Sequence, residues 1–346
     1  GWVIKYLVEY FRGNAKLLAE DGYFTDFISN GVSTELCFVA FCAFTLIIIF
    51  AGVQNGIERV SKIMMPILIV LSVIIAVYSV TRPGALAGVK YFLVPNVKNF
   101  SWMTVVSAMG QMFYSLSIAM GILITFGSYM KKDTAIEDST RNVEVFDTGI
   151  AIMAGLMIIP AVFAFSGGDP DTLQAGPSLM FITIPKVFQN MGFGTVIGIV
   201  FFLLVLFAAV TSSIALTESA VSTFEDELGW GRKKATVLVG VIMLVLGSLS
   251  SLGYGPLAGI KIIGMQFLDL FDFLTNSVMM PIAALLTSLL VSRVVGIDKI
   301  EEEIIHGESA FRRKKVFVVM IKYLCPVFAI IILLSSVANA LGWIKM

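Results

Sequence analysis

Long apolar stretches, separated by short polar segments, recur along the whole chain. An α-helix needs about 20 apolar residues to cross the hydrocarbon core of a bilayer. The pattern therefore predicts membrane-spanning helices over residues 36–53, 58–80, 104–130, 140–165, 195–223, 235–252, 265–292 and 319–342. A further apolar stretch at 1–11 is too short to cross alone, so the chain is expected to start part-way along a helix.

One predicted span carries polar residues and glycine where lipid would be expected. The stretch Gly110–Gly121 contains Gln111, Ser115 and Ser117, and apolar residues continue directly after it. Unsatisfied backbone groups are costly in hydrocarbon, so such stretches survive mainly where they line a wet cavity. The stretch is therefore predicted to form part of a binding site.

A second polar patch lies in mid-membrane at 208–216. Thr211 and Ser212 supply hydroxyls, and Ala208 could supply a carbonyl one turn earlier, a set of oxygens that suits a hard cation. Serine and threonine in membrane helices also pack helix interfaces or bond back to the preceding turn. The pattern alone leaves both interpretations open.

Several carboxylates lie in or near the spans, namely Asp147, Glu218, Asp269 and Asp272. Ionisable groups are costly at that depth and are functional candidates by default. Asp147 could instead cap the cytoplasmic end of its helix, and no partner for Glu218 can be named from the sequence.

Composition agrees with a polytopic membrane protein. Hydrophobic residues make up 58% of the chain and charged residues 14%, against about 45–50% and about 25% in soluble domains. Mean hydropathy is +0.92. His306 is the single histidine and stands in a charged segment, while Cys37, Cys42 and Cys325 stand in apolar surroundings. This scarcity argues against a zinc or di-metal enzyme.

Lysine and arginine are distributed unevenly, which sets orientation in a membrane. One set of loops carries most of them: Arg59, Lys62, Lys131, Lys132, Arg141, Arg232, Lys233, Lys234, Arg293, Lys299 and Arg312–Lys315. We place these loops in the cytoplasm and Met346 outside. The charged run Lys299–Lys315 is expected to form a solvated cytoplasmic helix. The outside loops 81–101 and 166–194 are long enough for lids, or are connectors with short surface helices.

Four motifs in order along the chain resemble the neurotransmitter:sodium symporter family, and in particular its bacterial amino-acid transporters. They are Gly52–Pro66, Gly110–Tyr129, Thr211–Ser213 with Phe224–Leu228, and Leu268–Phe273. The resemblance implies an all-α polytopic membrane protein with a LeuT-like inverted-repeat fold.

The resemblance also implies that the chain is an N-terminally truncated fragment, running from the second half of transmembrane helix 3 to helix 11. The expected parts are the remainder of the first repeat at 1–80, an extracellular loop at 81–103, the second repeat at 104–292, a cytoplasmic loop at 293–318 and helix 11 at 319–346. Such a fragment alone is not expected to transport.

Residues are carried over from the family one by one. For sodium, in one or two sites, the resemblance implies Ser115, Asp147, Ala208, Thr211 and Ser212. For the substrate it implies Tyr114 as a lid, Ser117, Met120, Ser213 and Leu216. For the outer gate it implies Gln111 and Asp272, and for the inner gate Tyr129 and Asp226. By their spacing alone, Met120 and Leu216 would be ordinary packing residues.

Two departures from the family pattern refine the expectation. Asp147 stands where relatives carry an asparagine, so a fixed carboxylate could replace the chloride of eukaryotic relatives and make chloride unnecessary. Met120 stands where relatives carry a phenylalanine, and an adaptable thioether favours a bulky or varied apolar substrate.

The sequence thus predicts a sodium-coupled importer of a hydrophobic or aromatic amino acid, in the bacterial inner (plasma) membrane. Its partners are the amino acid, sodium and the lipid bilayer, with no nucleic acid and an undetermined oligomeric state. It is expected not to be an enzyme, because no nucleophile and base pair is visible. A channel is disfavoured because the polar residues cluster at two points, and a non-transporting sensor or scaffold with the same fold stays open.

Overall fold

The structure is a computed structural model that describes residues 1–169, 173, 176–308, 310–340 and 343. Within these residues the regular secondary structure is helical apart from one isolated bridge between Ile262 and Met265. Met346, predicted to lie outside the cell, and Pro170 of the second long loop fall outside the described residues.

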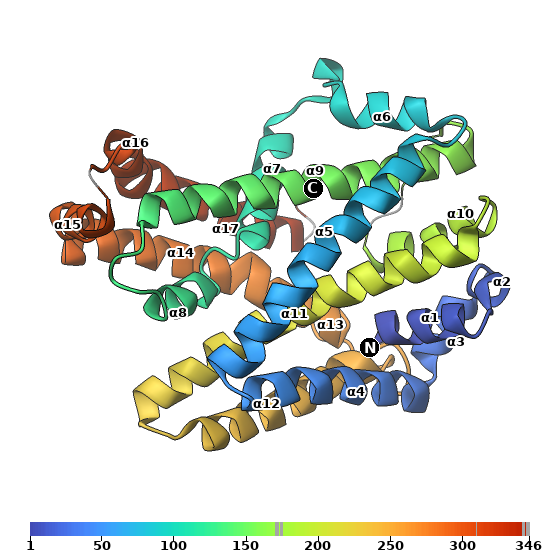
Figure 1. The fold of residues 1–346 in the computed structure, drawn as a ribbon, viewed down its shortest axis with the longest axis horizontal. Helices are drawn as coiled ribbons and strands as arrows, with labels where there is room; N and C mark the ends of the chain where they lie inside the picture. The colour runs from blue at the N-terminus through green and yellow to red at the C-terminus, as the bar shows by residue number, and fades with distance from the viewer. Residues whose placement is uncertain (170–172, 174–175, 309, 341–342, 344–346) are drawn as a thin grey trace. The chain divides into compact units, whose positions relative to one another are not determined.

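Seven helical segments of the described chain are long and apolar enough to cross a membrane (Figure 1). They are α4 (Gly31–Phe50), η1 (Val53–Glu58) with α5 (Arg59–Val80), α9 (Ile136–Ser166), α11 (Gly194–Leu228), α12 (Arg232–Leu252), α13 (Phe267–Asp272) with η5 (Phe273–Met279), α14 (Met280–Leu289) and η6 (Leu290–Val295), and α16 (Lys314–Val319) with η7 (Met320–Leu324) and α17 (Cys325–Ala340). Seven of the eight predicted spans are therefore confirmed as long apolar helices.

The eighth predicted span, 104–130, is wrong as a continuous helix. It consists of α7 (Trp102–Ser115) and α8 (Ile122–Ser128), with non-helical backbone between them. The start of α7 follows from its sequence, because Ser101 accepts a hydrogen bond from the Thr104 backbone N–H at 3.3 Å. Its end coincides with the polar and glycine-containing stretch.

Shorter helices occupy the connections. They are α1 (Trp2–Phe11), α2 (Ala15–Leu18), α3 (Tyr23–Ser29), α6 (Ala85–Leu93), η2 (Val97–Asn99), η4 (Leu179–Thr183), α10 (Ile184–Gln189) and α15 (Ile297–Gly307). The two long outside loops therefore contain short helices. The predicted single helix over Lys299–Lys315 is wrong, because α15 ends at Gly307 and a new helix begins at Lys314.

Local capping explains why the helices begin earlier than hydropathy predicts. Asn30 accepts a hydrogen bond from the Ser33 N–H at 3.1 Å, so α4 begins at Gly31 rather than at residue 36. A hydropathy window begins where the apolar residues begin, whereas a capped helix can include the polar residues that precede them.

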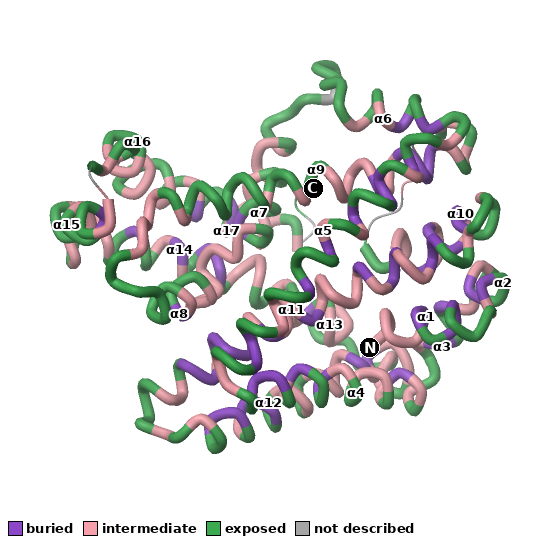
Figure 2. The backbone as a smooth tube through the Cα atoms, viewed as in Figure 1, coloured by how far each residue is buried: buried purple, intermediate pink, exposed green. Residues whose placement is uncertain are grey.

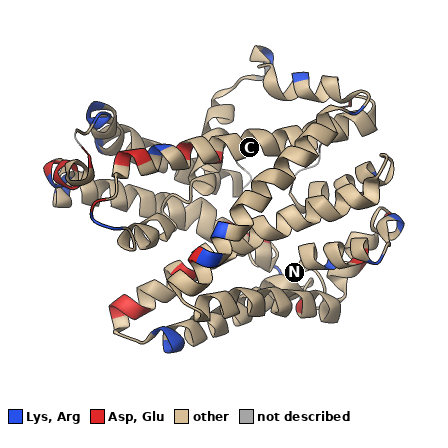
Figure 3. Cartoon of the chain, viewed as in Figure 1, with Lys and Arg blue, Asp and Glu red and all other residues tan. Residues whose placement is uncertain are grey.

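Exposed apolar surface is abundant, as expected for helices that contact lipid. Only 11% to 33% of the residues in the seven apolar windows are buried. Figure 2 shows buried positions as short runs along the helices, with exposed and intermediate positions between them. Figure 3 shows Lys, Arg, Asp and Glu mostly near helix ends and in connections, which keeps the middle of the long helices apolar.

The chain divides into two compact units, which are described separately. The first comprises Gly1–Pro95 and Gly149–Leu268. In it α11 packs against α1 and α5, and α12 packs against α4. An aromatic group surrounds Tyr6, whose hydroxyl donates to the Phe181 carbonyl at 2.7 Å, and Phe202 lies 5.3 Å from the Tyr6 ring. These buried rings hold α1 against α11.

The second unit comprises Asn96–Thr148 and Asp269–Met346. Within its described residues, α14 packs against α17. Its core contains Phe113 of α7, Met280 and Ala284 of α14, and Ala329 and Ile332 of α17. Phe113 thus fixes the end of α7 to the two long helices of this unit.

A buried ion pair joins three helices of the first unit. Glu218 of α11 is fully buried, and its two carboxylate oxygens accept hydrogen bonds from Arg232 at 3.0 and 2.6 Å. The Arg232 Nε also donates to the Ile49 carbonyl near the end of α4 at 3.0 Å. The partner of Glu218 that the sequence could not name is therefore Arg232 at the start of α12.

We predict that Arg232→Met destabilises the protein by about 3–5 kcal/mol, because it leaves the Glu218 charge buried without its partner. The measurement is thermal unfolding in detergent. The double variant Glu218→Met with Arg232→Met should recover most of the loss. Lys233→Met, which changes the exposed neighbouring residue, should have little effect. A loss as large in Lys233→Met as in Arg232→Met would contradict this account.

Candidate functional site

The break between α7 and α8 is the centre of the candidate site. The last turn of α7 closes with a Leu116 N–H bond to the Met112 carbonyl at 3.0 Å, and α8 restarts at Ile122. Between them Ser117 and Ala119 adopt the left-handed backbone region with φ of 54° and 64°. Residues other than glycine are strained in the left-handed backbone region, and such strain often marks a functional site. The predicted interruption is therefore present as an unwound segment.

At the end of α7 the structure brings two predicted sodium ligands together. Ser115, the last residue of α7, donates its hydroxyl to the Asp147 Oδ1 at 2.5 Å. The two residues are 32 positions apart in the chain and belong to the same unit. A hydroxyl, a carboxylate and the carbonyl end of a helix thus converge at one point.

The alternative role of Asp147 as a helix cap is excluded by its position. α9 begins at Ile136, so Asp147 lies three turns inside the helix. Its carboxylate contacts Ser115 at the end of α7 and does not cap the first turn of α9.

The second predicted sodium patch lies in α11 of the other unit. The Thr211 hydroxyl lies 3.0 Å from the Ala208 carbonyl and 3.0 Å from the Phe207 carbonyl. Thr211 therefore bonds back to the preceding turn, as the packing interpretation predicted, and at the same time brings two oxygens together. Ser212 is exposed beside it.

The predicted substrate residues are distributed over both units. In the second unit Tyr114 is 53% exposed at the end of α7, and Ser117 lies in the unwound segment. Met120 packs against the core around Phe113, which favours its packing role. In the first unit the Ser213 hydroxyl lies 3.0 Å from that of Thr45 on α4, and Leu216 is 49% exposed.

The predicted gate residues are exposed at helix surfaces. Asp272 accepts a hydrogen bond from the Asn276 amide at 2.5 Å, and Gln111 is exposed on α7. Tyr129 makes an edge contact with Phe126 at 6.1 Å between ring centroids. Asp226 is exposed near the end of α11, in the other unit from Tyr129.

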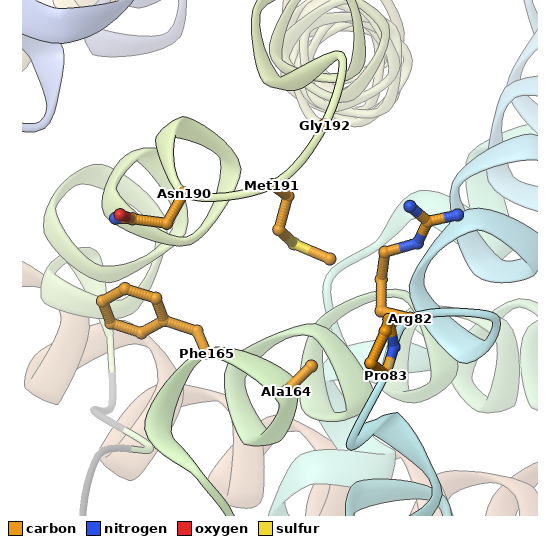
Figure 4. A pocket seen from close by; sticks show the side chains of 7 residues that line it. All are labelled: Arg82, Pro83, Ala164, Phe165, Asn190, Met191 and Gly192. Carbon is orange, nitrogen blue, oxygen red and sulfur yellow. The ribbon is translucent and has the colours of Figure 1, made fainter.

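A cavity of about 390 Å³ in the first unit lies away from these residues (Figure 4). Its lining residues come from the end of α5, the end of α9 and the turn before α11: Arg82, Pro83, Ala164, Phe165, Asn190, Met191 and Gly192. The Arg82 guanidinium lies over the Tyr78 ring at 4.4 Å and bonds to the Tyr78 carbonyl at 3.2 Å. None of the predicted site residues lines this cavity.

Sequence reasoning missed the groups that hold Asp147 and Ser213 in place. Thr45, opposite Ser213, sits in an apolar run with no local signal of its partner. Glu144 precedes Asp147 by one turn and binds Arg313 at 2.8 and 3.1 Å. The spacing of Glu144 and Asp147 on one helix face could have drawn attention to this acidic pair.

Comparison with known proteins identifies the family. The sequence model of the sodium:neurotransmitter symporter family matches residues 5–343. The chain belongs to this family. The fold is helical and polytopic, and the prediction that the protein is not an enzyme is consistent with a family of transporters.

The relatives are sodium-dependent transporters without assigned substrates. An uncharacterized sodium-dependent transporter of Bacillus subtilis, YhdH, is 33% identical over 97% of this chain and 75% of its own length. One from Haemophilus influenzae is 30% identical over 97% and 74%. One from Methanocaldococcus jannaschii is 30% identical over 75% and 52%. These comparisons do not support the predicted truncation.

A solved structure of the same family resembles the chain throughout. MhsT in complex with L-phenylalanine has a TM-score of 0.83 and 33% identity, covering 97% of this chain and 76% of that chain.

We predict that Ala119→Val abolishes substrate and sodium binding, whereas Ala119→Gly retains both. A β-branched side chain is disfavoured at the φ of 64° that the unwound segment requires, and glycine adopts it freely. The measurement is equilibrium ligand binding to purified protein. Ala151→Val, a change in the regular part of α9, serves as the control. Retention of full binding by Ala119→Val would show that the left-handed backbone is dispensable.

Proposed function

We propose that the protein is a sodium-coupled symporter that imports a hydrophobic or aromatic L-amino acid across the bacterial plasma membrane by alternating access. The observation that carries this proposal is the Ser115–Asp147 pair at the end of a helix that stops in mid-span. Membership in the family supports sodium coupling, and the neighbour's bound L-phenylalanine supports the substrate class.

The end of α7 has the chemistry of a sodium site. The carbonyl end of a helix carries partial negative charge, and the Asp147 carboxylate adds a full one close by. Ser115 retains lone pairs for a cation while its O–H donates a hydrogen bond to Asp147. Hard cations prefer such oxygen ligands, so Ser115 and Asp147 would bind the first sodium, which here is a transported ion.

A second sodium would use Ala208, Thr211 and Ser212. The Thr211 hydroxyl donates its hydrogen bond to the backbone carbonyls of Phe207 and Ala208, which leaves its lone pairs for a cation. One or two sodium sites are thus proposed, each assigned within a single unit of the chain.

Chloride is proposed to be unnecessary. Two unit charges 4 Å apart interact by roughly 4 kcal/mol at an effective dielectric of 20, so a fixed carboxylate can stand in for an anion beside sodium. Asp147 supplies that charge from the protein itself.

The substrate would lie at the unwound segment. Polar backbone and Ser117 suit the charged groups of an amino acid, and the exposed ring of Tyr114 suits an apolar side chain. In the first unit, Leu216 and Ser213 are assigned to the substrate by the family resemblance alone, as an apolar wall and a hydroxyl. Met120 is the weakest member of the proposed set because it packs against the core of its own unit.

Transport requires that sodium and substrate favour one conformation over another. A ligand shifts such an equilibrium only by its differential affinity for the two states. Tyr114 with Gln111 and Asp272 would close the outer side, and Tyr129 with Asp226 would close the inner side. One charge moving through 100 mV releases about 2.3 kcal/mol, so inward sodium is a sufficient driving force.

We predict that L-phenylalanine binding to the full-length protein depends on sodium. The variants Asp147→Ala, Ser115→Ala and Thr211→Val should each raise the half-saturating sodium concentration by roughly tenfold or more. A tenfold change corresponds to about 1.4 kcal/mol for one lost ligand. Isothermal titration at several sodium concentrations measures this. Asp138→Asn on α9 and Thr81→Val, a threonine that also bonds back to its own helix, are the controls.

Two results would contradict parts of this proposal, namely transport itself and the assigned sodium ligands. Sodium-dependent binding without uptake into liposomes would favour a sensor over a transporter. Equal sodium dependence in wild type and all three variants would show that the assigned ligands are wrong.

We predict that wild-type binding is the same in sodium chloride and sodium gluconate, because Asp147 supplies the negative charge. Asp147→Asn should weaken binding in gluconate and regain part of it when chloride is added. The measurement is L-phenylalanine binding at fixed sodium in the two salts. A wild-type protein that requires chloride would overturn the assignment of Asp147 as the replacement for chloride.

A further inference from the structure

The connection between α15 and α16 lies against the beginning of α9. We call residues 307–308 and 310–314 of this connection the α9 clamp. The approach is close, since a Cβ on Gly307 would lie 2.6 Å from the Thr134 carbonyl oxygen, just before α9 begins. All of these residues belong to the second unit, which also contains Ser115 and Asp147.

The α9 clamp and the first turn of α9 cap each other. The Glu308 carboxylate accepts hydrogen bonds from the backbone N–H groups of Glu137 and Asp138 at 2.6 and 3.3 Å. These are first-turn donors that have no partner within their own helix. In return the Glu137 carboxylate accepts the backbone N–H of Arg312 at 2.8 Å. A carboxylate at this end of the helix is also favoured by the helix dipole.

A second contact holds α9 two turns further along. Nη1 of Arg313 donates to both oxygens of Glu144 at 3.1 and 2.8 Å, and its Nε lies 3.9 Å from Glu137. Glu144 precedes Asp147 by three residues, so the two side chains share a face of α9. Asp147 in turn accepts the Ser115 hydroxyl. The α9 clamp and the end of α7 therefore contact the same stretch of α9, at positions three residues apart.

We infer that the α9 clamp positions Asp147 and thereby sets the sodium affinity of the Ser115–Asp147 site. Glu308 and Arg313 act as positioning residues and would not touch the ion. The inference rests on the proposed function for the identity of the ion. Because the predicted orientation places this connection in the cytoplasm, release of the α9 clamp would weaken the site on the side where sodium is discharged.

A purely electrostatic role of Arg313 predicts the opposite sign. If Arg313 acted only through its charge, its removal would make the surroundings of Asp147 more negative and would increase sodium affinity. If it positions α9, its removal decreases sodium affinity. The direction of the change therefore decides between the two.

The experiment measures the half-saturating sodium concentration for L-phenylalanine binding to the full-length protein, and the phenylalanine affinity at saturating sodium. We expect Arg313→Ala and Glu144→Gln to raise the half-saturating sodium concentration by roughly threefold to tenfold, which is within the range by which distant residues modulate coupling between sites. The phenylalanine affinity at saturating sodium should change much less. Arg313→Lys should stay near wild type, because the contact to Glu144 comes from one nitrogen atom.

Arg312→Ala is the matched control. It removes the same charge from the neighbouring position, but the hydrogen bond of Arg312 to Glu137 comes from its backbone and survives the change. Glu308→Gln, which keeps the shape and removes the charge, should raise the sodium value less than Arg313→Ala does. It also provides a second measurement if Arg313→Ala fails to fold.

The outcomes are distinguishable from a failure of the proposed function. If wild-type binding shows no sodium dependence, the proposed function and this inference both fall. If wild type depends on sodium but Arg313→Ala and Glu308→Gln leave the sodium value unchanged or lower it, the inference alone is overturned. An equal change in Arg312→Ala would likewise overturn it, because the effect would then not depend on the contact between the Arg313 side chain and Glu144.

Discussion

Backbone hydrogen bonding in hydrocarbon is the constraint from which this architecture follows. A helix satisfies its own amides, so most of the chain crosses the apolar layer as uninterrupted helix. At the interruption after Ser115 the neighbouring α9 places the Asp147 carboxylate, which accepts the Ser115 hydroxyl at the end of α7. The place where the regular helix fails is therefore also the place where polar chemistry becomes available.

Three polar groups elsewhere in the spans show two ways of being satisfied, a bond at short range and one specific distant partner. Thr211 bonds to its own preceding turn, Ser79 donates to the Met157 carbonyl at 2.7 Å, and Glu218 is paired with Arg232. These solutions differ in what they require. A back-bond needs only helix geometry, whereas a buried carboxylate needs a distant cation of the right reach.

The helix α9 connects a capped helix start with the Ser115–Asp147 pair at the end of α7. Its first turn is capped by Glu308 from a segment about 170 residues away, and its third turn carries Asp147. A helix transmits position along its axis because its internal hydrogen bonds make it stiff over a few turns. The geometry at the end of α7 thus depends on contacts made at the surface, well outside the apolar layer.

The sequence by itself determined seven of the apolar spans, the polar and glycine-containing character of Gly110–Gly121 and the family, because hydropathy and residue type are local properties. That the helix stops after Ser115 was decided only in the tertiary structure. The charged run led to one predicted helix over Lys299–Lys315, whereas α15 ends at Gly307 and Glu308 continues in extended backbone to cap α9. The sequence could not pair Glu218 with Arg232 or assign Glu308 and Arg313 to α9. Those pairings join segments that are distant in the chain, and the charges involved have many possible partners until the packing of the helices selects one. Met120 packs against its own unit's core, as its helical spacing alone indicated, whereas the resemblance had implied a wall of the substrate pocket.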